Sequence, residues 1–229
     1  MLNFLAKLFR QETLDIILPA TWQTLYMVLV ATPITIFFGL LFGISLYITD
    51  KNGLYPIPIF NKTFGAVINA VLALPSMIVI ILALPISKFI VGVSYGPKAC
   101  IIALTIVCTP IFSRLVESSI LEVSKGKIEA AKSMGASTCD IIFKVMLPEA
   151  LPTLIRNFIV LTITLISITA IAGTFGAGGL GEVAVRFGYH RFKIDILLVA
   201  VLVLLVLVES LQFLGDRLSK RILKKRHLI

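Results

Sequence analysis

Long apolar runs alternate with short polar stretches along the chain. A helix needs about 20 predominantly apolar residues to cross the hydrocarbon core of a bilayer. Five runs approach or exceed that length, and we predict a transmembrane helix over each of residues 21–48, 64–86, 98–113, 151–172 and 196–214. The pattern therefore predicts an all-α integral membrane protein with about five spans, in which residues 1–229 form a single transmembrane domain.

The first predicted span contains a proline and a pair of glycines. We expect Pro33 to kink this helix. Gly39 and Gly43 are four residues apart, so they share one helix face, where they would let a second helix approach closely. Glycine is also common in membrane helices in general. The sequence leaves both interpretations of this pair open.

The longest polar stretch covers residues 114–150, between the third and fourth predicted spans. Its apolar residues still recur at helical spacing, which predicts two short helices with a break near Gly135. Ser137 or Thr138 would cap the second helix. The recurring residues are Ile128, Ala131, Met134, Ile141, Ile142, Val145 and Met146.

The composition agrees with a membrane protein. Hydrophobic residues make up 58% of the chain, against about 45–50% in soluble domains. The net charge of +9 would point to nucleic acid in a soluble protein. Here the basic residues collect beside the predicted spans, where they contact anionic lipid headgroups. We therefore expect the lipid bilayer as a partner and no nucleic acid.

The distribution of Lys and Arg predicts the orientation. Residues 49–62, 114–150 and 215–229 together hold thirteen of these residues, whereas the segments on the opposite side hold seven. Loops rich in Lys and Arg stay in the cytoplasm. We predict a cytoplasmic C-terminus, an N-terminus outside, and a cytoplasmic loop over residues 114–150.

A sequence motif lies in this predicted cytoplasmic loop. Glu129, Ala130 and Ala131 are followed by three residues and Gly135, and nine residues later the chain continues Val145, Met146, Leu147, Pro148. This string resembles the EAA signature of permease subunits of ATP-binding-cassette (ABC) importers. The resemblance implies the type I importer permease fold and a loop that couples the spans to a separate ATPase. The implied coupling residues are Glu129, Ala130, Ala131, Met134, Gly135, Leu147 and Pro148.

Each motif position also has a physical role. The two alanines keep the helix slim enough to enter a groove, and Gly135 permits a sharp turn or a close backbone approach. Pro148 would fix where the next helix begins. Glu129 would pair with a basic group of a partner or of the loop; alternatively, it is a solvated charge on a helix face.

The later part of the chain resembles methionine-uptake permeases, in residues 177–195, the last span and residues 215–221. That resemblance implies a homodimer in a bacterial inner membrane, two ABC ATPase subunits, and an extracellular or periplasmic binding protein. The substrate it implies is an amino acid, D- and L-methionine. No GxxxxGK[ST] loop is present, so we expect no cofactor on this chain and ATP on the partner.

Other functions stay open as alternatives. The permease could carry another amino acid or an osmolyte. A secondary transporter would be expected to show inverted repeats, and no repeat is visible. For an intramembrane enzyme we find no catalytic constellation, and we assign no catalytic or metal-ligating residue.

Polar residues inside the spans either line a substrate route or form hydrogen bonds between helices, which is the commoner role. The candidates for the route are Asn69, Ser76, Thr164, Ser167 and Thr174. The glycine-rich residues 173–181 lack the strand that precedes a phosphate loop. We expect a tight external turn or a re-entrant element there, in contact with a delivery protein.

Overall fold

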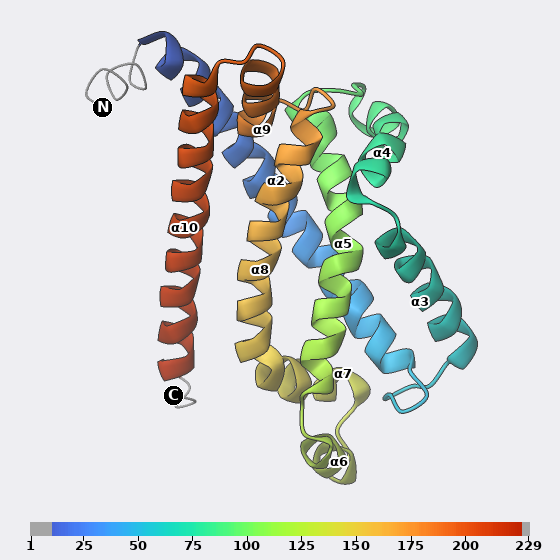
Figure 1. Ribbon diagram of the computed structural model, residues 1–229. Helices are drawn as coiled ribbons and strands as arrows, with labels where there is room; N and C mark the ends of the chain where they lie inside the picture. Colours follow the sequence, from blue (N-terminus) through green and yellow to red (C-terminus); the bar gives the residue numbers. More distant parts are fainter. Residues whose placement is uncertain (1–10, 226–229) are drawn as a thin grey trace. The chain divides into compact units, whose positions relative to one another are not determined.

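The computed structural model describes residues 11–225, and every regular element within this range is helical (Figure 1). The predicted placement of the two chain ends concerns residues 1–10 and 226–229, which lie outside the described range. The long helices are α2 (Gln11–Thr49), α5 (Pro97–Leu121), α8 (Leu147–Gly173) and α10 (Ile194–Lys225). Shorter elements lie between them: α3 (Pro58–Ala73), α4 (Ser76–Val91), α6 (Lys125–Ser133), α7 (Thr138–Asp140), the π-helix η1 (Ile141–Met146), α9 (Gly179–Val183) and the π-helix η2 (Ala184–Tyr189).

Four helical stretches are long and apolar enough to cross a membrane, and the number rises to five if the bent pair α3–α4 counts as one span. The sequence predicted one helix over residues 64–86, but the structure has two helices that meet at an angle of 110°. The break falls at Pro75, which has no N–H to donate and whose ψ of 133° is extended. Its carbonyl accepts the N–H of Ile78 at 2.9 Å and so begins α4.

The helices also extend beyond the predicted spans. Pro33 lies inside α2, which is a single helix of 39 residues, and the kink there stays a prediction. The third span was predicted to end at residue 113, whereas α5 continues to Leu121. This extension was missed because its charged residues obscure a buried face, formed by Val116, Ser119 and Ile120. The polar segment between the long helices is therefore shorter than residues 114–150.

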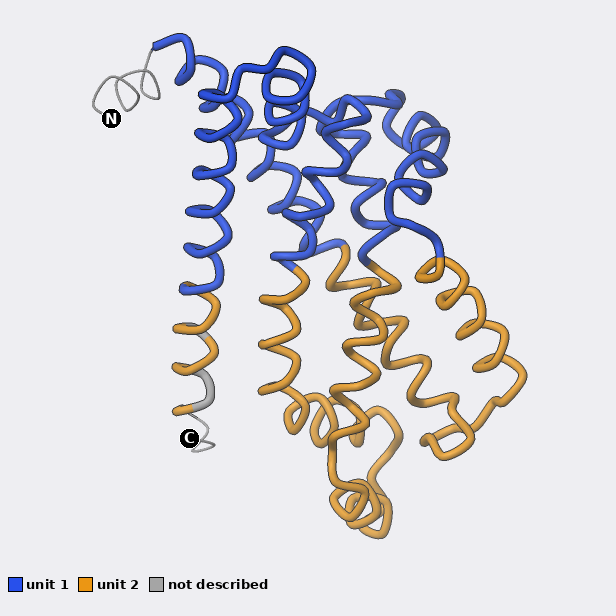
Figure 2. The backbone as a smooth tube through the Cα atoms, in the orientation of Figure 1, with its two compact units in different colours: residues 1–34, 74–108, 162–213 blue, residues 35–73, 109–161, 214–229 orange. Residues whose placement is uncertain are grey.

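The chain divides into two compact units, which Figure 2 colours separately. Unit 1 comprises residues 1–34, 74–108 and 162–213. Its core includes a cluster in which α2, α9 and α10 contribute buried side chains, among them Ile17, Leu180 and Ile196.

Unit 2 comprises residues 35–73, 109–161 and 214–229. Its core includes the fully buried side chains of Phe112, Val116 and Met146. A Cβ on Gly43 would lie 2.5 Å from the carbonyl oxygen of Ser113, and one on Gly39 would collide with Phe112. Of the two interpretations of this glycine pair, close helix packing is therefore the one observed, between α2 and α5.

Candidate functional site

The segment between α5 and α8 consists of α6, α7 and η1, and Figure 1 shows α6 projecting beyond the ends of α5 and α8. In α6, Ile128 and Ala131 are buried at 6% and 4% exposure. Glu129 and Ala130 lie on the exposed side. The two alanines of the motif therefore differ in role. Ala131 is buried within unit 2, whereas Ala130 keeps the exposed face of the helix slim.

Gly135 ends α6 through backbone hydrogen bonds. Its N–H donates to the carbonyl of Lys132 at 2.9 Å, and the N–H of Ala136 donates to that of Ala131 at 3.1 Å. This pair of bonds is a Schellman motif, which needs a left-handed residue, and Gly135 has φ +79°. A Cβ at this position would meet nothing within 4 Å. Gly135 therefore has the expected turn, and within the described part of this chain no other segment approaches it closely.

Two large apolar side chains of this segment point outward. Met134 follows α6 and is 81% exposed, and Phe143 in η1 is 67% exposed. Met134 recurs at helical spacing with Ile128 and Ala131, but unlike them it lies after the end of α6 and is not buried. Ser137 caps α7, as one of the two predicted capping residues, and its Oγ accepts the N–H of Asp140 at 3.2 Å.

The segment continues into α8 without a break. The N–H of Leu147 donates to the carbonyl of Ile142, five residues earlier, which is the wide turn of a π-helix. Pro148 is the second residue of α8, so this helix begins beside the proline, although η1 precedes it without an intervening loop. The π turn accommodates the proline, which supplies no N–H of its own. Leu147 is half-buried directly after the buried Met146.

Side-chain contacts fasten the segment to its neighbours. Lys127 Nζ of α6 lies 2.6 Å from Glu149 Oε2 of α8. Thr153 Oγ1 of α8 donates to Glu122 Oε2 at 2.8 Å, just after α5. Further along α8, Asn157 donates to Ser119 Oγ of α5 at 2.8 Å. The first contact therefore joins α6 to α8, and the other two join α8 to α5 and the residue that follows it.

Glu129 lies beside a hollow of 250 Å³. The hollow is lined by Tyr47, Asn52, Gly53, Leu54, Lys125, Ile128, Glu129 and Lys132. Within residues 11–225, no basic group lies within ion-pair distance of the Glu129 carboxylate. The alternatives that remain for Glu129 are a basic group of a partner and a solvated charge.

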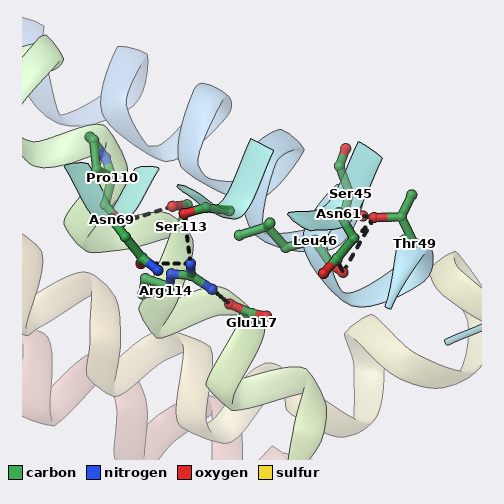
Figure 3. Close-up of polar contacts among 10 residues, drawn as sticks. Ser45, Leu46, Thr49, Asn61, Asn69, Pro110, Ser113, Arg114 and Glu117 are labelled. Atoms are coloured by element: carbon green, nitrogen blue, oxygen red, sulfur yellow. Dashed lines mark hydrogen bonds and ion pairs between the residues drawn. The ribbon is translucent and has the colours of Figure 1, made fainter. Parts of the chain in front are cut away.

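An arginine that sequence reasoning counted as a loop charge joins two helices of unit 2. Figure 3 shows Arg114 of α5 donating through Nη2 to Asn69 Oδ1 of α3 at 2.7 Å and through Nη1 to Glu117 at 2.6 Å. Its Nη2 also donates to the carbonyl of Gly65 at 3.2 Å. An arginine beside an apolar run needs such partners. The partner on α3 could not be named from sequence, because it is 45 residues away.

Near its beginning, α3 is also attached to α2 by a polar side chain. Asn61 donates through Nδ2 to the carbonyl of Leu46 at 2.6 Å and to Thr49 Oγ1 at 3.1 Å (Figure 3). On α3, only Gly65 and Ile68 are buried. Polar contacts therefore carry much of the attachment of α3 within unit 2.

The five candidates for the substrate route belong to different units: Asn69 lies in unit 2, and Ser76, Thr164, Ser167 and Thr174 lie in unit 1. Asn69 is on α3 and bonds to Arg114, whereas Ser76 is the first residue of α4. Ser167 and Thr174 donate to carbonyls of their own chain segment, Ile163 at 3.1 Å and Ile171 at 2.7 Å. Thr164 is half-buried on α8. Asn69 therefore forms a hydrogen bond between helices, and a role in the substrate route stays a prediction for all five residues.

The glycine-rich residues after α8 form a tight turn against α2. Gly178 and Gly179 have φ of +83° and +80°. The N–H of Gly179 donates to Gln23 Oε1 at 2.8 Å, and the N–H of Leu180 donates to Thr24 Oγ1 at 2.9 Å. Of the two predicted alternatives the structure has the tight turn, while its external position and its contact with a delivery protein stay predictions. Gln23 and Thr24 bond to this turn, and sequence reasoning missed them.

Comparison with known proteins identifies the family. The model of the family "Binding-protein-dependent transport system inner membrane component" matches residues 17–224. The chain belongs to this family. The probable D-methionine transport system permease protein MetI of Vibrio cholerae is 44% identical, over 96% of this chain and 97% of that protein. The methionine import system permease protein MetP of Bacillus subtilis is 42% identical, over 90% and 93%.

Solved structures agree with this assignment. A chain of the MetNI methionine ABC transporter in inward-facing conformations matches with a TM-score of 0.91 at 33% identity, over 93% of this chain and 99% of that chain. An amino acid ABC transporter solved with histidines matches with a TM-score of 0.73 at 17% identity, which shows the fold alone. The predicted family and fold class are confirmed: this is an inner-membrane permease subunit of an ABC importer, a transport component rather than an enzyme.

Proposed function

We propose that this permease imports methionine, as both D- and L-enantiomers, by alternating access driven by a separate ATPase. The observation that carries the proposal is the likeness to the methionine permeases of Vibrio cholerae and Bacillus subtilis, which extends over at least 90% of the chain. A likeness of that extent includes the spans and the segment between α5 and α8 together. Another amino acid or an osmolyte is the alternative substrate.

The assembly we propose is a homodimer with two ABC ATPase subunits and an extracellular or periplasmic binding protein. The ATPases bind ATP, so this chain carries no cofactor. They lie on the cytoplasmic face with α6 and the C-terminus, while the N-terminus lies outside. The Lys and Arg distribution supports this orientation.

In this proposal α6 docks into a groove of the ATPase. The exposed side chains of Met134 and Phe143 would fill apolar pockets of that groove, because well-packed apolar anchors carry much of the affinity of protein interfaces. The contacts of Lys127 with Glu149 and of Thr153 with Glu122 would then pass the motion of the ATPase to α8.

Copurification of the ATPase tests this arrangement. The full-length permease and its ATPase are coexpressed, extracted in mild detergent and purified through the permease. Met134→Glu removes no packing from the permease itself, because this side chain is 81% exposed. We expect it to reduce copurified ATPase at least tenfold, which corresponds to about 1.4 kcal/mol. Met134→Leu is the matched control and should retain the ATPase.

Two results would count against the proposal. If no ATPase accompanies the unmodified permease, the proposed docking of α6 into an ATPase groove fails. If the ATPase is present but labelled methionine is not taken up by proteoliposomes that hold the complete complex with its binding protein, the substrate assignment fails. Competition by unlabelled amino acids and osmolytes then identifies the substrate.

A further inference from the structure

Two open hollows adjoin at the end of unit 1 that carries the glycine-rich turn. One has a volume of 420 Å³ and lies among α2, α9, η2 and the turn. The other has a volume of 470 Å³ and lies between α2 and the residues that lead into α5. Gln23, Gly96 and Pro97 line both hollows. Their volumes are typical of sites for small molecules, about 300–1,000 Å³.

The first hollow brings together a carboxylate, a guanidinium and an amide. Glu182 Oε2 accepts the N–H of Gly178 at 3.0 Å, which fixes the position of the carboxylate. Its Oε1 is 3.4 Å from Arg186 Nη1, and the Arg186 side chain is 57% exposed. This long, exposed contact uses one of the five N–H donors of the guanidinium, so most of them are available to a ligand.

Gln23 presents its amide group to the same hollow. Its Oε1 accepts the N–H of Gly179, so the orientation of the amide is determined by the turn. Among the described residues, its Nε2 donates to no protein acceptor. Ile16, Val183 and Phe187 supply apolar lining. The hollow therefore combines positioned polar groups with apolar side chains, as the binding sites of small molecules do.

The second hollow is aromatic. Trp22, Tyr26 and Tyr95 line it and are 68%, 36% and 75% exposed. Lys98 adds a cation at the rim. Aromatic rings make favourable contacts with apolar side chains and with the sulfur of a thioether.

We propose that these two hollows form one site for a free amino acid with an apolar side chain. The ligand carboxylate binds Arg186, its ammonium group binds Glu182, and its side chain lies against Trp22. Opposite charges a few ångströms apart match the two charges on the Cα of a zwitterion, and each contact is a charge-assisted hydrogen bond. The ligand class rests on the proposed import of an amino acid; the location rests on the geometry of unit 1.

The chain offers a direct reporter, because Trp22 is its one tryptophan. The full-length permease is reconstituted in nanodiscs without other proteins, and Trp22 emission is followed during titration with L-methionine. We expect a saturable change in emission. Methioninamide, which lacks the carboxylate, and N-acetylmethionine, which lacks the ammonium group, should each bind at least tenfold more weakly.

Variants of two arginines distinguish a site from a surface ion pair. Arg186→Gln should weaken methionine binding at least tenfold. Arg191→Gln is the matched control, because Arg191 lies 5.1 Å from the Phe187 ring and does not line the hollow. It removes the same charge and should leave the affinity unchanged.

The proposal is overturned if Trp22 emission shows no saturable change, if methioninamide binds as well as methionine, or if the two arginine variants bind alike. The analogue series on the unmodified protein decides the question even if Arg186→Gln does not fold. Failure of the proposed function gives a different result, namely no methionine uptake by the complete transporter. If the complete transporter takes up methionine but Trp22 emission does not change on titration, this site is refuted and the proposed function is not.

Discussion

Two glycines of this permease are required for different physical reasons, and a matched pair of substitutions separates them. Gly135 has φ +79°, and a Cβ added there would meet nothing within 4 Å, so only its backbone conformation demands glycine. Gly43 has no such φ, but a Cβ would lie 2.5 Å from the Ser113 carbonyl and 2.6 Å from Val116 Cβ. At Gly43 it is therefore the size of the side chain that matters.

Glycine should be the most stable residue at both positions, but the expected order of asparagine and alanine is reversed between them. An L-residue in the left-handed region costs about 1–2 kcal/mol, and asparagine tolerates this region better than alanine. At Gly135 we expect glycine to be best, asparagine next and alanine worst. At Gly43 each added atom must displace α5, at about 1–3 kcal/mol for overpacking. There alanine should be better than asparagine.

Hydrogen exchange measures the first series. The amide of Ala136 donates to the carbonyl of Ala131 only while the turn at Gly135 is intact. A cost of 1–2 kcal/mol corresponds to a factor of about 5–30 in the opening equilibrium. Exchange at Ala136 should accelerate by that factor in Gly135→Ala and by less in Gly135→Asn. The thermal midpoint in detergent measures the Gly43 series.

The reasoning is refuted if asparagine and alanine rank in the same order at both positions. It is also refuted if Gly135→Ala leaves exchange at Ala136 unchanged, because the Schellman turn would then not depend on glycine. A lowered thermal midpoint for Gly135→Ala without faster local exchange would indicate a packing contact that the structure lacks.

Three further predictions concern side-chain contacts. Arg114→Leu should reduce the free energy of unfolding by about 1–3 kcal/mol and so lower the thermal midpoint, because it removes the charged hydrogen bond to Asn69 (2.7 Å). Arg114→Lys should recover part of the loss. An unchanged midpoint in both variants would contradict the role of Arg114 in joining α5 to α3. Gly181→Val should prevent stable folding, since even the Cβ of the new side chain would lie 2.6 Å from the Ala170 carbonyl oxygen; a monodisperse size-exclusion profile like that of the unmodified protein would refute this. Lys127→Ala should change stability by less than about 1 kcal/mol, because its ion pair to α8 is half-exposed, and a larger shift would show that the pair contributes more than a surface contact.

Local patterns predicted much of this protein. Hydropathy predicted the long helices, because a helix in lipid satisfies its backbone hydrogen bonds within its own segment and needs only a continuous apolar run. The break after Gly135 was predictable because a glycine that ends a helix is a local feature. Charge misled the prediction at residues 114–121, since a helix with one buried face continues through charged positions. Pro75 was visible in the second span, but hydropathy alone did not reveal that the helix breaks there.

The sequence by itself determined the fold class, the family motif and the end of α6, because these depend on residues that are neighbours in the chain. The tertiary structure alone decided which side chain holds which element. The partner of Arg114 is 45 residues away, and the partners of the glycine-rich turn, Gln23 and Thr24, are 156 residues away. A polar group bonds to whatever partner folding brings within about 3 Å, and no local pattern records that proximity.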